Sequence, residues 1–91
     1  MKTIYKYEIA LSEGTVEVPE NHEVLHIGEQ NGRLFMWVLV GDSYFVKIIS
    51  SLVIGTGWPV EGVSGKGYFG TVQMASGLVW HVFLSGANRK T

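Results

Sequence analysis

The sequence predicts a mainly β fold, a single small antiparallel sandwich or barrel of about six or seven short strands. Short runs rich in Val, Ile, Phe, Tyr and Trp recur at nearly regular spacing, and turn-forming residues separate them. No segment joins a helix-capping pattern to an apolar period of about 3.6 residues. A chain of 91 residues makes one domain. We therefore assign residues 1–91 to one β domain and expect residues 88–91 to form a flexible tail.

The N-terminal third of the chain predicts three strands. In the first, Thr3–Ile9, polar and aromatic residues alternate, so the tyrosines face inward while Lys6 and Glu8 face solvent. The second, Thr15–Pro19, ends at a proline, which cannot donate a hydrogen bond to a neighbouring strand. The third covers Glu23–Ile27.

Asn31–Gly32 is the clearest hairpin signal, because both residues tolerate the positive φ angles of a type I′ turn. The arm that follows, Leu34–Val40, is seven apolar residues in a row, which predicts a central strand buried on both faces. A two-residue loop pairs Gln30 with Arg33, Gly28 with Phe35, His26 with Trp37 and Val24 with Leu39.

The C-terminal half predicts one long strand region and a final hairpin. The strand region is Tyr44–Ile54, with a break expected at Ser50–Ser51. A glycine-rich connection leads to the hairpin Gly67–Leu84, whose two-residue loop we place at Ser76–Gly77. A loop at this position pairs Gln73 with Trp80 and Val72 with His81 across the two strands. One face then carries Phe69, Ala75, Leu78, Trp80, Val82 and Leu84, and the other carries Val72, Met74, Val79 and Phe83.

This hairpin is therefore apolar on both faces. Because a small domain has one core, a second sheet, a partner chain or a ligand must cover the extra face. The charged content of 16% is low, which also suggests that part of the surface is an interface.

Charge and composition exclude several classes of protein. The net charge is −1, so the chain lacks both the basic stripe of a nucleic-acid binder and the acidic excess of a nucleic-acid mimic. Its only basic cluster, Arg89-Lys90, is expected to be a solvated terminus. The absence of cysteine excludes disulfides and thiolate metal sites. The chain has no signal-peptide core and no apolar run of roughly 20 residues, so we expect a soluble cytoplasmic protein without membrane contact.

No motif predicts catalysis, a cofactor or a metal. The carboxylates fall mostly in turns or at outward positions, and no serine lies in a nucleophile elbow. Gly55-Thr56-Gly57 is too short for a dinucleotide fingerprint. His22 and His26 share a predicted strand face but lie roughly 13 Å apart, too far to ligate one ion. His26 and His81 instead predict core or interface histidines.

The candidate binding residues are aromatic, basic and histidine side chains. The glycine-rich loop ends in Trp58-Pro59 and could expose an indole, a side chain enriched at binding hot spots. The full set of candidates is Trp58, Tyr68, Arg33, Trp37 and His81.

A set of sequence motifs covers nearly the whole chain up to Phe83. They are an opening Lys2–Tyr7, Val24–Ile27 followed by Gln30–Gly32, an apolar strand containing Trp37, a turn Ile54–Pro59, and an ending of Tyr68–Gln73 and Gly77–Phe83. On these motifs the chain resembles a family of small uncharacterised proteins encoded by bacteriophages and prophages. The resemblance implies a phage origin and a bacterial host cell, and it implies no activity.

Two departures from that family limit what the resemblance implies. Trp58 stands where the family usually has histidine, so no role of that histidine carries over. The segment Asp42–Ile49 is also less charged than the family pattern.

Small phage proteins without catalytic residues often act by binding. The leading hypothesis is a non-enzymatic inhibitor that docks on a host protein, such as a defence protein, through an apolar aromatic face. The alternative is a homo-oligomeric sponge for a nucleotide-type small molecule, with Arg33 or Lys66 binding phosphate and an aromatic ring stacking on the base. A third hypothesis is a structural or accessory phage component.

Overall fold

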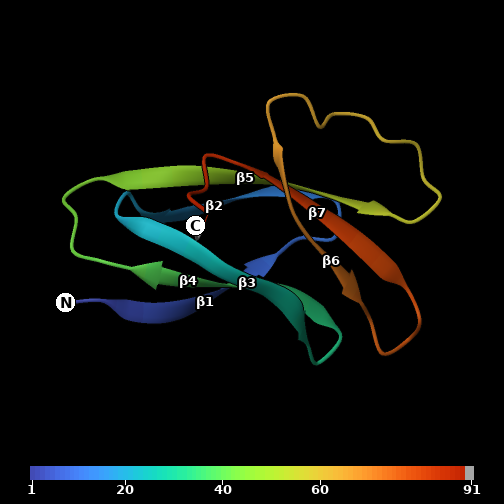
Figure 1. The fold of residues 1–91 in the computed structure, drawn as a ribbon, viewed down its shortest axis with the longest axis horizontal. Helices are drawn as coiled ribbons and strands as arrows, with labels where there is room; N and C mark the ends of the chain where they lie inside the picture. Colours follow the sequence, from blue (N-terminus) through green and yellow to red (C-terminus); the bar gives the residue numbers. More distant parts are fainter. Residues whose placement is uncertain (90–91) are drawn as a thin grey trace.

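Seven strands and no helix are found in residues 1–89, the part of the chain that the computed structural model describes. The strands form two separate antiparallel sheets, one of three strands in the order β1-β4-β3 and one of four in the order β2-β5-β7-β6. Figure 1 shows these two layers, and the prediction of a mainly β sandwich is confirmed. The strands are β1 Thr3–Ile9, β2 Glu13–Pro19, β3 His22–Gln30, β4 Arg33–Val40, β5 Val46–Gly55, β6 Gly67–Gln73 and β7 Val79–Ser85.

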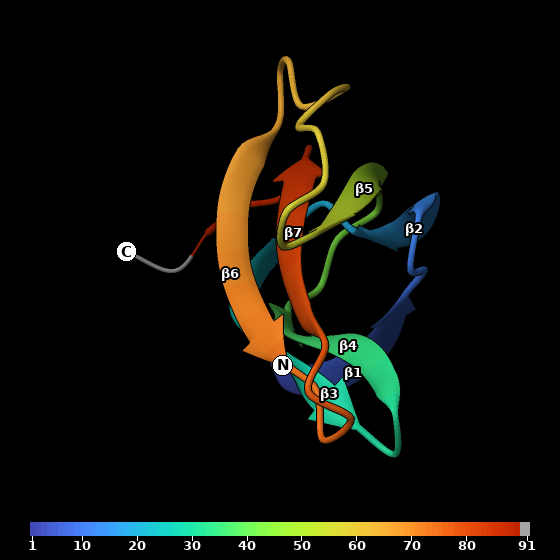
Figure 2. The same cartoon turned by 90° about the vertical axis from the view of Figure 1, so that its right-hand side faces the viewer.

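The core lies between the facing surfaces of the two sheets. β4 is the central strand of the three-stranded sheet, and its side chains Leu34, Met36 and Val38 are almost fully buried against the other sheet. Figure 2 shows the four-stranded sheet as one curved layer, with β6, β7, β5 and β2 side by side. That sheet contributes Val18, Ile49, Val53, Val72, Trp80, Val82 and Leu84 to the core.

The β3–β4 hairpin forms at the predicted turn. Asn31 has a φ of 54° and Gly32 a φ of 79°, the positive angles that a type I′ turn requires. The pairs of Gln30 with Arg33 and His26 with Trp37 are confirmed, as is that of Gly28 with Phe35. Beyond them, a β-bulge between Val24 and His26 shifts the register, so Val24 faces Val38 and not Leu39.

This bulge also separates two histidines that the sequence places on one strand face. His22 pairs with Val40 and is 6% exposed, pointing into the sandwich. His26 pairs with Trp37 on the outer face, and their ring centroids are 5.5 Å apart. The prediction of a shared face is wrong because one extra residue in a strand reverses the alternation of every side chain before it.

The β6–β7 hairpin differs from its predicted register by one residue. The amide of Met74 donates to the carbonyl oxygen of Leu78, so the loop has three residues, and Gly77 adopts a φ of 95° in it. Val72 consequently faces Trp80, and His81 faces Thr71. The corrected register gathers the buried side chains on one inward face: Val72, Met74, Trp80, Val82 and Leu84.

β5 is continuous and begins later than predicted. It runs without a break through Ser50–Ser51, and Ser51 is buried with its hydroxyl donating to the carbonyl oxygen of Gly14, 3.3 Å away. Because this bond satisfies the buried Ser51 hydroxyl, the strand can continue through the serines at which the sequence predicted a break. Tyr44 and Phe45 lie before the strand, in the loop from β4.

Two residues of the expected tail are held against β3. Asn88 accepts a hydrogen bond at its carbonyl from the amide of Val24, and Arg89 forms a parallel bridge with Val24. The Nδ1–H of buried His22 donates to the carbonyl oxygen of Pro19, 2.8 Å away, and its Nε2 accepts from the amide of Asn88, 3.0 Å away. Asn88 and Arg89 are exposed to solvent, and these bonds connect their backbone to β3 and to His22. Residues 90 and 91 lie outside the described residues.

Candidate functional site

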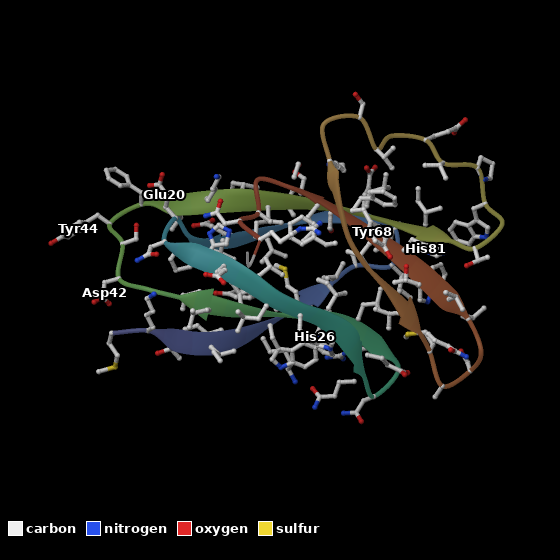
Figure 3. All side chains as sticks on the ribbon, in the orientation of Figure 1. Glu20, His26, Asp42, Tyr44, Tyr68 and His81 are labelled. Atoms are coloured by element: carbon white, nitrogen blue, oxygen red, sulfur yellow. The ribbon has the colours of Figure 1, made fainter. Side chains whose placement is uncertain are left out.

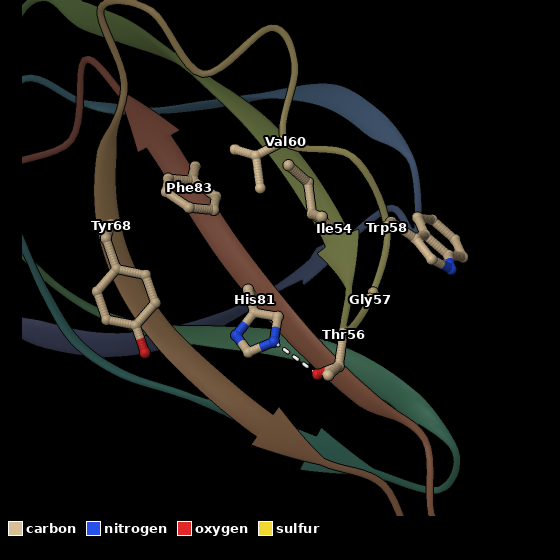
Figure 4. A pocket seen from close by; sticks show the side chains of 9 residues that line it. Ile54, Thr56, Gly57, Trp58, Val60, Tyr68, His81 and Phe83 are labelled. Carbon is tan, nitrogen blue, oxygen red and sulfur yellow. Dashed lines mark hydrogen bonds between the residues drawn. The ribbon is translucent and has the colours of Figure 1, made fainter.

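An apolar pocket of about 210 Å³ lies on the outer face of the four-stranded sheet. Its floor is Ile54 of β5 and Phe83 of β7, and its rim includes Tyr68 of β6 (Figure 4). The connection between β5 and β6 crosses beside this face and supplies Val60 to the lining. The extra apolar face of the final hairpin is thus partly covered by the protein's own loop, and the remainder is open.

Four hydrogen-bonding side chains form a continuous chain along this face. His81 Nε2 lies 2.7 Å from Thr56 Oγ1, and His81 Nδ1 lies 2.9 Å from Thr71 Oγ1. The hydroxyl of Tyr68 is hydrogen-bonded to the same Thr71 oxygen. In neutral imidazole one nitrogen donates and the other accepts, so both nitrogens of His81 are engaged. The pocket therefore presents apolar surface and no unpaired basic nitrogen.

Trp58 stands at one side of the pocket, with its indole turned away from His81 (Figure 4). Its ring meets that of Trp80 edge to face, with centroids 5.4 Å apart at 81°. The ring also lies over Gly55, where an added Cβ would come within 2.8 Å of Trp58 Cε2. Gly55 is therefore required for this close approach, and Trp58 remains 54% exposed.

Trp58 also borders a second hollow of about 310 Å³ on its other side. This hollow shares Gly55 and Thr56 with the first and adds Leu78 and Trp80. Trp58 thus separates two depressions on this face.

The other two candidates, Arg33 and Trp37, lie on the outer face of the opposite sheet. Arg33 pairs with Glu8 at 3.4 Å, and its guanidinium carbon lies 5.6 Å from the Phe35 ring centroid. The Lys6 ammonium lies 4.5 Å from the same ring. Phe35 is 7% exposed beneath these two cations, so its ring is covered by charged side chains of its own sheet. The structure thus brings together Trp58, Tyr68 and His81 and leaves Arg33 and Trp37 apart.

One exposed aromatic feature was missed from the sequence. Tyr44 is 102% exposed and Phe45 is 69% exposed, at the tip of the β4–β5 loop. They were missed because the sequence pattern placed both in a strand that begins at Tyr44, and alternate side chains of a strand are expected to be buried. The Gly41-Asp42-Ser43 turn that precedes them was the available signal.

Other features of residues 1–89 offer less for a site. A hollow of about 550 Å³ is lined by Gly41–Tyr44, and because the Asp42 and Tyr44 side chains are almost fully exposed it is an open surface depression. Within this range no group of three or more His, Cys, Asp or Glu residues could hold a metal ion. The same residues contain no helix of the length and hydropathy that crossing a membrane requires.

The chain is thus a small antiparallel β-sandwich with an apolar pocket on the outer face of one sheet. The chain belongs to a family described as a domain of unknown function, DUF7352, whose model matches residues 1–91. Searches among curated proteins and among solved structures found no match to the chain.

Proposed function

We propose that this protein is a non-catalytic binding protein that docks on a host protein and inhibits it. The docking site is the apolar pocket, with Trp58 and Tyr68 as anchors at its rim. The observation that carries the proposal is the combination of two exposed aromatic rings with a pocket whose Thr56, Tyr68 and His81 side chains are already hydrogen-bonded within the protein. The resemblance to phage proteins supports a bacterial host as the source of the partner.

The size of the pocket supports a protein partner over a nucleotide. Sites for drug-sized ligands and cofactors usually enclose about 300–1,000 Å³. The pocket holds about 210 Å³ and opens at the surface, and the Trp58 indole separates it from the neighbouring hollow of about 310 Å³. A pocket divided in this way fits one apolar side chain of a partner on each side of the indole. Exposed aromatic anchors around such a pocket are the residue types that dominate protein interfaces.

The positions of the cations weaken the sponge hypothesis. Arg33 lies on the opposite sheet in its pair with Glu8. The Lys66 ammonium lies 3.4 Å from the Ser85 hydroxyl and borders a different depression. Neither cation lies beside the aromatic pocket, whereas binding a nucleotide needs both phosphate and base contacts in one place.

Affinity purification from the bacterial host, read by native mass spectrometry, tests the proposal. The wild-type protein is expected to retain a host protein at fixed stoichiometry. Trp58→Ala/Tyr68→Ala is expected to lose it, because both anchors are removed from the rim. The matched control is Arg33→Ala, which removes an exposed side chain from the opposite sheet and is expected to retain the partner.

Circular dichroism checks that each variant is folded before capture is compared. Equal retention by wild type and by the double variant would reject the anchors. A wild-type protein that carries nucleotide-sized extra mass and no protein would favour the sponge. A species with neither would reject both and leave a structural role.

A further inference from the structure

His22 is a buried histidine whose two ring nitrogens have fixed and different roles. The residue is 6% exposed. Its Nδ1 lies 2.8 Å from the carbonyl oxygen of Pro19 and 3.2 Å from that of Glu20, and because a carbonyl only accepts, Nδ1 carries a proton. Its Nε2 lies 3.0 Å from the amide nitrogen of Asn88, which only donates, so Nε2 carries none. Backbone groups therefore fix His22 as the neutral Nδ1–H tautomer.

The segment bonded to His22 crosses the side of the sandwich between β3 and β6, the edge strands of the two sheets on this side. It leaves β7 at Gly86, where φ is 81° and an added Cβ would meet the Ile48 carbonyl oxygen at 2.7 Å. Ala87 then packs against the core. The guanidinium carbon of Arg89 lies 4.3 Å from the centroid of the Phe69 ring on β6. We call residues 86–89 the C-terminal strap.

Asn88 makes three of the hydrogen bonds that hold the strap on β3. Its carbonyl oxygen accepts from the amide of Val24 at 2.8 Å, and its side-chain amide donates to the carbonyl oxygen of His22 at 3.2 Å. The third is the bond from its backbone amide to His22 Nε2. Because one residue makes all three bonds, moving its amide away from the ring weakens the other two.

A second proton on His22 is incompatible with the closed strap. An Nε2–H would point at the Asn88 amide hydrogen, so two donors would face each other at a buried site and the hydrogen bond would be lost. Among residues 1–89 no carboxylate lies within ion-pair distance of the ring, since the pairs there are Met1 with Asp42 and Arg33 with Glu8. The charged residues of the neighbouring segments are Glu20, Glu23, Asp42, Lys47 and Arg89. A charged ring is therefore favoured only when it reaches solvent.

We propose that His22 is a pH-dependent latch, which holds the C-terminal strap closed while the ring is neutral and releases it when the ring is protonated. Only the open form binds the second proton, so a fall in pH favours opening. Release leaves the Val24 amide and the His22 carbonyl unpaired on the edge of β3 and removes Arg89 from Phe69. An unpaired strand edge is a surface on which another extended chain can pair.

The latch is separate from the apolar pocket. Figure 3 shows Glu20, whose carbonyl oxygen lies beside the His22 ring, toward one end of the long axis, and Tyr68 and His81 of the pocket toward the other. The latch is therefore tested by a measurement that does not depend on docking at the pocket.

Amide hydrogen exchange followed by NMR between pH 7.5 and pH 5.0 measures the opening of the strap. An exposed histidine takes up its proton near about pH 6.5, so the opening constant is expected to rise about 30-fold over this range. The protection factor of the Val24 amide, corrected for the intrinsic exchange rate at each pH, is expected to fall by the same factor. The amide of Met36, in the central strand β4, is expected to keep its protection.

Two variants assign the pH dependence to one histidine. His22→Gln keeps an acceptor near the position of Nε2 but does not titrate, so protection at Val24 is expected to be independent of pH. The matched control is His26→Gln, which removes an exposed histidine of the same strand and is expected to keep the 30-fold fall. The ring ¹⁵N chemical shifts of wild-type His22 are expected to show the neutral Nδ1–H tautomer at pH 7.5.

Four results would overturn the latch. They are constant protection at Val24 in wild type, a fall that Met36 shares equally, a pH dependence that persists in His22→Gln, and an Nε2–H or doubly protonated His22 ring at pH 7.5. If His22→Gln does not fold, the wild-type comparison of Val24 with Met36 and the ring shifts decide.

Discussion

The contact between Trp58 and Gly55 yields a sharp prediction about stability, since the indole lies where a side chain at this glycine would be. In Gly55→Ala the new Cβ would meet Trp58 Cε2 at 2.8 Å, and two further ring atoms at 3.1 Å. No real Cβ contact is this short, so the ring must swing into solvent. It then loses its edge-to-face contact with Trp80, which is worth about 0.5–1.5 kcal/mol.

The burial of Trp58 sets the size of the effect. The residue is 54% exposed, so slightly under half of its surface lies against the protein. That surface is on the order of 100 Å², which at about 25 cal/mol per Å² gives an upper limit of about 2.5 kcal/mol. Replacing a strand glycine by alanine returns roughly 0.5–1 kcal/mol of backbone entropy. We therefore expect Gly55→Ala to lower the free energy of unfolding by about 1–2 kcal/mol.

A double-mutant cycle isolates this contact. Trp58→Ala alone is expected to cost about 2–3 kcal/mol. In that background the methyl group added by Gly55→Ala no longer meets a ring, so the substitution becomes neutral or stabilises by up to about 1 kcal/mol. Urea denaturation followed by far-UV circular dichroism measures all four proteins. An equal cost of Gly55→Ala in both backgrounds would show that Trp58 does not lie over Gly55.

Two further predictions concern the three-stranded sheet and its neighbours. His22→Leu removes the hydrogen bonds to the Pro19 carbonyl and from the Asn88 amide and is expected to cost about 2–4 kcal/mol. The amide of Val24, which donates to Asn88, should then exchange its hydrogen much faster, and unchanged protection would contradict the role of His22 in holding the C-terminal segment. Partial burial, followed by the nearby Tyr5, raises the pKa of Tyr7 above its ordinary value of 10.0. Because the folded protein disfavours the ionised phenol, stability is expected to fall as pH rises above about 10, and less steeply in Tyr7→Phe. Parallel urea midpoints for the two proteins from pH 8 to 11 would refute this.

The sequence predicted most of the strands because their apolar patterns are strong. Leu34–Val40 is apolar at every position, and it is the central strand of its sheet. The Asn31–Gly32 turn was also predicted with its pairs, since few residues accept two consecutive positive φ angles.

The errors arise where one extra residue changes a register. Nothing in the sequence around Val24 and Leu25 indicates the bulge. Because of it, His22 faces the core and His26 faces outward. In the last hairpin, Gly77 suits a two-residue and a three-residue loop equally well. Only packing decides between them, because the longer loop unites Val72 with Trp80 on the core face.

The candidate site could be predicted in part from its position beside a glycine-rich connection. Trp58 and Tyr68 lie in or beside a glycine-rich connection, which predicts exposure, and the structure places them around one pocket with His81. Arg33 and Trp37 were grouped with them by residue type alone, and the sequence holds no information that separates the two sheets. The exposure of Tyr44 and Phe45 was not predicted, because the start of the strand was placed two residues too early, at Tyr44 and not Val46.

The most direct test of the account is a map of the partner's footprint on this protein. Amide NMR spectra of the labelled 10.1 kDa chain, with and without the captured host protein, give that map. The account predicts shifted or broadened amides around Ile54–Val60, Tyr68 and His81, and little change around Arg33 and Trp37. Changes centred on the outer face of β1, β3 and β4 would contradict the account and assign binding to the opposite sheet.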